Sequence, residues 1–110
     1  MNAATALLLH GCAGAALTLL STFVGARSIT VVDPEIMGCE HGCNVVATGW
    51  PLTFVSDYLG MSVVNTADIT EVWFAADRFD WRMFLINAAV WTLASLAAHA
   101  GLLWWRAARR

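Results

Sequence analysis

The chain has 110 residues, of which 59% are hydrophobic and only 13% charged, and its mean hydropathy is +0.64. A soluble domain of this length needs about twice that charged fraction to solvate its surface. A formal charge of -2 with no lysine excludes a nucleic-acid binder, which needs cations to neutralise phosphates. Composition therefore predicts a small integral membrane protein. We expect no enzyme, since no serine elbow and no glycine-rich phosphate loop is present.

Two uncharged stretches, residues 4–26 and 83–105, are each 23 residues long. A helix of that length rises about 35 Å, enough to cross a bilayer core. Inside lipid every backbone amide must pair within its own segment, so both stretches are predicted to be transmembrane helices. The expected fold class is an all-α membrane protein, an antiparallel hairpin of two transmembrane helices between a short N-terminal end, 1–3, and a basic tail, 106–110.

The second stretch has aromatic and basic residues at both ends. Such side chains favour the level at which hydrocarbon meets headgroups. The predicted interface anchors are Trp81 and Arg82 before the helix, Trp104, Trp105 and Arg106 at its end, and Trp73 in the preceding loop.

The first stretch could instead be a cleaved signal peptide. Residues 1–3 lack the expected Lys or Arg, however, and the apolar run is longer than usual, so a retained helix is favoured. Arginines near the helix ends number three on each side and do not fix the orientation. Cys39 and Cys43 favour an oxidising compartment for the loop. We therefore expect both termini in the cytoplasm and a periplasmic loop, in a bacterial inner membrane, either cytoplasmic or intracytoplasmic.

The ~56-residue loop, 27–82, contains all eight carboxylates. Within it, the apolar residues Ile69, Val72 and Trp73 recur at helical spacing and predict a short amphipathic helix near 67–76. Such a helix either lies at the membrane interface or packs on a partner subunit.

The loop also carries two cysteines four residues apart, Cys39 and Cys43, which predict a disulfide. An alternative is a metal site in which His41 and Met37 join them, a soft ligand set that suits copper(I). The Cys-x-x-x-Cys spacing resembles the loop of dinuclear copper sites in terminal oxidases. The next residues, 45–51, contain neither the His nor the Met of that pattern, so we expect no metal.

Two histidines, His10 and His99, fall on the same side of the bilayer, about 7 to 8 Å from its middle, if the helices are antiparallel. Intramembrane polar residues face protein or water and are functional candidates. One interpretation is a packed hairpin with two hydrogen-bonded histidines. The other makes them cofactor ligands, of a haem held between the helices or of bacteriochlorophyll. Small and polar residues on the same faces predict the helix contact: Gly14, Thr18, Ser21, Asn87 and Ser95.

Ala98-His99 followed by Trp105-Arg106 is similar to the end of the membrane helix in bacterial light-harvesting β polypeptides. The resemblance covers about 15 residues and implies His99 as a pigment ligand. Two departures stand against it: Ser95 occupies the position of a smaller alanine, and that family has a single span, which runs in the opposite direction under the expected topology.

These features predict an accessory subunit that stabilises a larger bioenergetic complex, photosynthetic or respiratory, through contacts with other integral membrane subunits and lipid. The first alternative is a cofactor-binding subunit that ligates haem or bacteriochlorophyll through His10 and His99. The second is an extracytoplasmic thiol or copper-binding membrane protein that uses Cys39 and Cys43.

Overall fold

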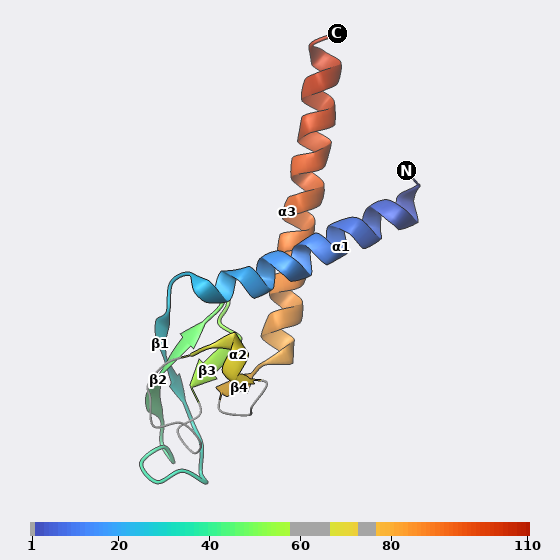
Figure 1. Cartoon of the computed structure of the whole chain (residues 1–110). Coiled ribbons are helices and arrows are strands. Elements are labelled where there is room, and N and C mark those ends of the chain that lie inside the picture. The colour runs from blue at the N-terminus through green and yellow to red at the C-terminus, as the bar shows by residue number, and fades with distance from the viewer. Residues whose placement is uncertain (1, 58–66, 73–76) are drawn as a thin grey trace.

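The computed structural model describes residues 2–57, 67–72 and 77–110. It consists of two long helices and a four-stranded sheet (Figure 1). The molecule is elongated, 64 × 21 × 20 Å, with the sheet at one end and both termini pointing away from it.

The first helix, α1 (Ala3–Leu20), continues into a short 3-10 turn, η1 (Ser21–Phe23). Asn2 caps α1, because its side-chain oxygen accepts a hydrogen bond from the Thr5 amide. The last helix, α3 (Trp81–Ala108), is capped by Asp80 in the same way. Both helices are long and apolar enough to cross a membrane.

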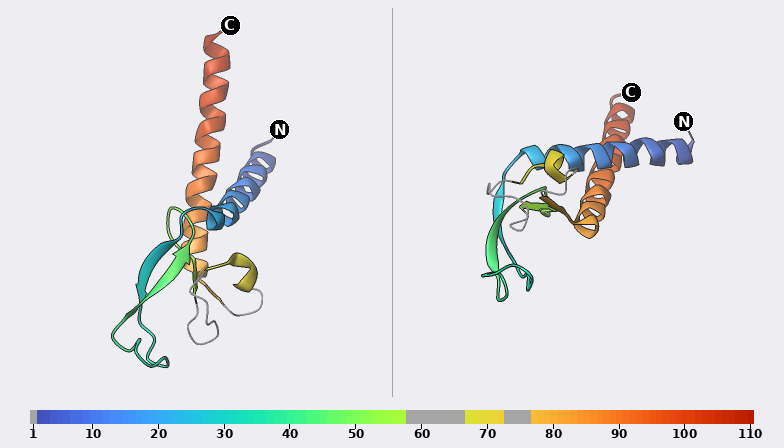
Figure 2. Two further views of the ribbon diagram at one scale, coloured as in Figure 1. Left: turned by 60° about the vertical axis from the view of Figure 1, so that its left-hand side comes forward. Right: turned by 60° about the horizontal axis from the view of Figure 1, so that its bottom comes forward.

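The two helices cross obliquely and do not lie side by side along their whole length (Figures 1 and 2). Small or polar residues occupy the contact, and among them Gly14, Thr18 and Asn87 are buried. Beyond the crossing, the first turns of α1 and the last turns of α3 separate, and their leucines are exposed.

The sheet is an antiparallel meander in the order β1-β2-β3-β4. Its strands are β1 (Arg27–Val31), β2 (Cys43–Thr48), β3 (Val55–Asp57) and β4 (Asp77–Phe79). Val45, Ala47, Phe54 and Val55 are almost fully buried and form the core of this end of the molecule.

The expected all-α fold class is therefore wrong. The chain between the helices folds as a sheet because β2 carries apolar residues at alternate positions, Val45 and Ala47, which bury one face. The strands that complete this sheet, β3 and β4, are three residues long each. Strands this short leave no alternating pattern in the sequence that could predict them.

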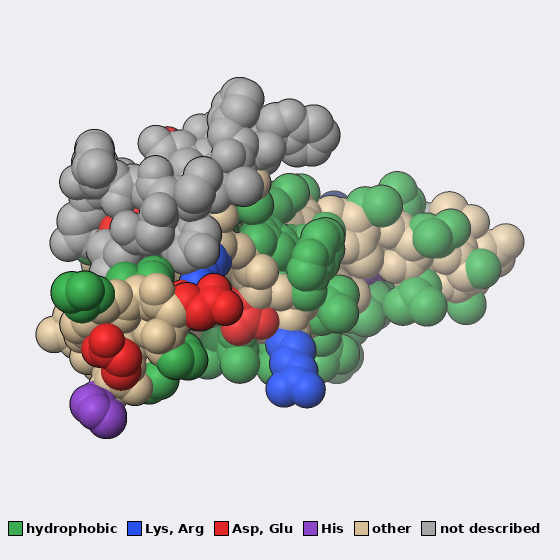
Figure 3. All heavy atoms as spheres, turned by 90° about the horizontal axis from the view of Figure 1, so that it is seen from below, with side chains coloured by type: hydrophobic (Ala, Val, Ile, Leu, Met, Phe, Trp, Pro, Cys, Tyr) green, Lys and Arg blue, Asp and Glu red, His purple; other side chains and the backbone are tan. Residues whose placement is uncertain are grey.

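The amphipathic helix expected near 67–76 corresponds, among the described residues, to one short turn, α2 (Ile69–Val72). Residues 73–76 lie outside the described part of the chain. The chain then enters β4, so no continuous helix leads into α3. Figure 3 shows acidic side chains gathered at the sheet end, while mostly hydrophobic side chains cover the helix that extends to the right.

Candidate functional site

The candidate site is the contact between α1 and α3, which we call the helix seam: His10, Gly14, Thr18 and Ser21 from α1 and η1, and Asn87, Thr92, Ser95 and His99 from α3. Its centre is Gly14. A Cβ atom there would lie 2.2 Å from the Thr92 hydroxyl oxygen and 2.9 Å from the Ala88 carbonyl oxygen. Thr18 is fully buried and donates its hydroxyl to the Gly14 carbonyl oxygen at 2.7 Å. The helices can therefore approach this closely only because residue 14 lacks a side chain.

Towards the chain termini, the seam brings together His10, Ser95 and His99. The His10 Nδ1 atom lies 2.5 Å from the Ser95 hydroxyl oxygen, a hydrogen bond. The centroids of the His10 and His99 rings are 5.2 Å apart, and the rings meet edge to face. His10 is half-buried, whereas His99 is exposed on α3. The two histidines that the sequence places at one depth are thus neighbours.

The hydrogen-bonding capacity of this cluster is only partly used. Ser95 holds one nitrogen of His10, but no described residue donates a hydrogen bond to His99 or accepts one from it. A polar group left without a partner in hydrocarbon is energetically costly. In a membrane, His99 would need a partner that this chain does not supply from its described residues.

The cluster is a poor fit for a haem held between the helices. An iron bonded to two opposed imidazoles separates the ring centroids by roughly 6 Å, given metal–nitrogen bonds of about 2 Å. Here the rings are closer and meet edge to face. One turn away, the backbone contact at Gly14 leaves no slot for the macrocycle. Ligation by His99 alone would leave the His10–Ser95 hydrogen bond intact.

At its other end, the helix seam joins the sheet through the segment Gly49–Phe54. Ser21 Oγ accepts a hydrogen bond from the Trp50 amide at 3.0 Å, and the Trp91 indole donates to the Trp50 carbonyl oxygen at 3.1 Å. Asn87, fully buried, accepts from the Leu52 amide at 3.1 Å and donates to the Leu52 carbonyl oxygen at 2.6 Å. Sheet and helices are therefore one connected unit.

Sequence reasoning missed this junction. The sequence predicts Asn87 and Ser21 as packing residues between helices, but their partners are backbone groups of Trp50 and Leu52. Backbone partners carry no residue-type signal, so nothing in the sequence indicates which loop segment meets these side chains.

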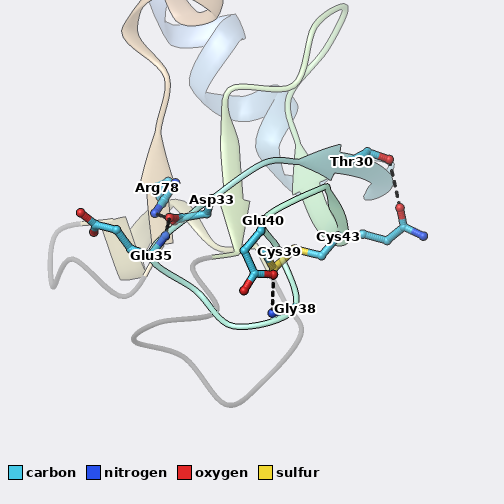
Figure 4. Close-up of a disulfide and its surroundings, with 9 residues drawn as sticks. Thr30, Asp33, Glu35, Gly38, Cys39, Glu40, Cys43 and Arg78 are labelled. Atoms are coloured by element: carbon cyan, nitrogen blue, oxygen red, sulfur yellow. Dashed lines mark hydrogen bonds and ion pairs between the residues drawn. A yellow bond between two sulfur atoms is a disulfide. The ribbon is translucent and has the colours of Figure 1, made fainter.

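The far end of the sheet holds the cysteine pair, joined as a disulfide with Cα atoms 4.9 Å apart (Figure 4). Cys39 is buried, whereas Met37 and His41 are exposed. An ion pair between Asp33 and Arg78 ties the same loop to β4. Among the described residues, no group of three or more His, Cys, Asp or Glu side chains could hold a metal. The disulfide occupies both sulfurs that the copper alternative would need as ligands.

The predicted interface anchors lie at the two ends of α3. Trp81 and Arg82 are exposed in its first turn, and Trp104, Trp105 and Arg106 are exposed in its last turns. The guanidinium of Arg109 lies 4.1 Å from the centre of the Trp105 ring, a cation–π contact. Trp73 lies outside the described residues.

An open groove of about 620 Å³ lies between the sheet and the start of α3. Its apolar lining includes Ile29 and Val31 of β1, Phe79 of β4 and Trp81 in the first turn of α3. Its polar lining consists of Thr53, Ser56, Arg78, Asp80 and Arg82.

The sequence matches no family model, and no curated protein or solved structure is significantly similar to it.

Proposed function

We propose that this chain is a membrane subunit with two transmembrane helices that stabilises a larger complex. Another integral membrane protein would pack against its helix seam and supply the hydrogen-bond partner that the seam lacks. The observation that carries the proposal is His99, an exposed imidazole on an otherwise apolar stretch of α3 whose hydrogen bonds no described residue satisfies. A neighbouring helix with a polar side chain at that depth would satisfy it.

Insertion in a membrane is supported by the side chains that the helices expose. Leu7, Leu8 and Leu93 are each more than 60% exposed. Water would solvate such a surface poorly, whereas lipid chains would cover it. In our proposal the sheet lies outside the bilayer, in the periplasm of a bacterium, because its disulfide requires an oxidising compartment. The assignment to a respiratory or photosynthetic complex stays a prediction.

A second candidate function is supported by the same histidine. Because Ser95 and the close ring contact hold His10, His99 is the histidine with open coordination capacity. It could ligate the metal of one pigment or haem that lies against the surface of α3. A chain purified gently from its native membrane would then absorb visible light. A spectrum without any band above the tryptophan region would eliminate this candidate.

The accessory-subunit proposal is tested by the size of the native assembly. The tagged wild type and a His99→Leu variant are extracted from the native membrane in mild detergent and compared by size-exclusion chromatography with light scattering. We expect the wild type to elute with partner polypeptides, well above its own 11.9 kDa, and at least half of the variant to elute as free chain.

The matched control is His41→Leu, since His41 is exposed and belongs to the loop between β1 and β2, which lies at the end of the sheet away from α3 (Figure 1). This variant should assemble like the wild type. A wild-type chain that elutes without partners, or a His99→Leu variant that assembles normally, would overturn the proposal.

A further inference from the structure

The outer edge of the sheet is formed by β1, which pairs with β2 alone over five residues, from Arg27 opposite Ala47 to Val31 opposite Cys43. Within the described part of the chain, only β2 forms backbone hydrogen bonds with β1. An edge strand directs every second pair of N–H and C=O groups away from the sheet. β1 therefore presents a row of unused backbone donors and acceptors.

Within residues 27–31, and among the described residues around them, this edge lacks the features that usually protect an edge strand. It contains no lysine or proline, its pairing with β2 is continuous, and Ile29, Thr30 and Val31 are β-branched. Its one charged residue, Arg27, donates hydrogen bonds to the carbonyl oxygens of Gly49 and Pro51 and so folds back over the end of β2. The opposite edge, β4, is only three residues long.

We infer that β1 is a docking edge, to which another polypeptide adds an extended segment as a fifth strand. The inference rests on the proposed function, since the added strand would belong to the membrane partner. Addition of a strand to an open edge is a common mode of recognition, with main-chain hydrogen bonds for affinity and alternate side chains for specificity.

A second copy of the chain in the same membrane does not fit this edge. β1 runs away from the helices roughly along the axis of α3 (Figures 1 and 2), so two copies in one membrane would present parallel β1 strands. A two-fold axis along the strands would then place each residue of one β1 directly opposite the same residue of the other, with the backbone groups of both pointing at each other. In a parallel ladder, a residue that directs its N–H and C=O to the neighbouring strand instead lies opposite a residue whose groups point away. The occupant is therefore a different polypeptide.

The two faces of β1 define the chemistry of the added strand. Ile29 and Val31 are half-buried and line the groove beside α3, while Ser28 and Thr30 are exposed on the other face. A strand that continues the sheet would place its apolar side chains over the groove and its small polar ones opposite. The expected segment alternates apolar with polar residues.

Hydrogen–deuterium exchange with mass spectrometry tests the inference, comparing the complex from native membranes with the same chain overproduced alone. In the complex, we expect amides within Arg27–Val31 to exchange at least tenfold more slowly than in the isolated chain. Amides of the inner strand β3 (Val55–Asp57) serve as the internal reference and should not change.

A pair of variants on the same strand provides the second readout. Ile29→Lys places a charge over the groove and should release the partner, whereas Ser28→Lys, on the exposed face, should not. Both must keep the disulfide and the circular dichroism of the wild type.

If the complex forms but its β1 amides exchange as fast as in the isolated chain, the docking edge is wrong and the proposed function stands. If the wild type elutes without partners before exchange begins, both are wrong.

Discussion

Gly14 is the residue at which α1 and α3 come closest. Because its hypothetical Cβ would collide with the backbone of Thr92 and Ala88, the neighbours cannot move aside as a flexible side chain would. Gly11, one turn earlier on the same helix, has no heavy atom within 4 Å of the place that a Cβ would take. The two glycines are thus a matched pair in one helix.

We expect Gly14→Ala to destabilise the helix pair by about 1 to 3 kcal/mol through overpacking. Gly11→Ala should be neutral or stabilising by up to about 1 kcal/mol, since alanine favours helix. Unfolding of both variants in detergent, followed by circular dichroism, measures the difference. Equal stabilities of the two variants would show that the helices do not meet at Gly14.

Asn87 is the buried residue of α3 that bonds to the segment between β2 and β3, and its removal leaves two backbone groups of Leu52 without partners. Asn87→Ala should cost about 1 to 3 kcal/mol and accelerate exchange of the Leu52 amide. Asn44→Ala removes only an exposed contact with the Thr30 hydroxyl and should cost less than about 1 kcal/mol. An unchanged exchange rate at Leu52 in the Asn87 variant would contradict the link.

At the scale of single residues, the sequence predicts which side chains meet between the two helices, but not which residues of the intervening chain contact the helices near the sheet. His10 and His99 can be paired because depth in an antiparallel hairpin follows from residue count alone. The contacts of Trp50 and Leu52 with the helices cannot be predicted in this way, because they depend on how the chain between the helices folds back on them.

Among the elements, the β1–β2 hairpin depends on long-range pairing and on one covalent bond. The disulfide closes a small ring at the turn, for which loop entropy gives about 2 kcal/mol of stabilisation. It ties the loop before β2 to the first residue of that strand, Cys43, which pairs with Val31 of β1.

Alkylation counted by intact mass checks this bond. Under denaturing conditions without reductant, one cysteine should react, Cys12, which is the free one. After reduction all three should react. Three alkylated cysteines before reduction would show that the loop is open in the native protein.

The cysteine spacing predicts the disulfide, but not the sheet around it. A run such as Ile29–Val32 indicates local β preference, whereas a sheet needs partners. Here the run pairs with β2, and residues 55–57 and 77–79, far along the chain, complete the sheet. Two of its three ladders are only two or three residue pairs long, so pairing is decided by burial of Val45 and Val55 and not by local propensity.

At the scale of the whole molecule, a few partly buried hydrogen bonds join an apolar helix pair to the sheet. Both long helices are predictable from length and charge alone, and they are as apolar as the sequence indicates. The oblique crossing of the helices is not predictable in this way. It depends on where the small residues bring α1 and α3 together and on where the sheet holds the end of α1 and the start of α3.

The central claim is that the helix pair crosses a membrane, with the sheet on one side and both termini on the other. In a Cys12→Ser background, single cysteines are introduced at Ser28, exposed on β1, and at Ala108, the last residue of α3. They are then labelled in intact cells with a membrane-impermeant maleimide. We predict that Ser28→Cys is labelled in intact cells and Ala108→Cys only after permeabilisation. Labelling of both positions in intact cells, or of neither, would contradict the account.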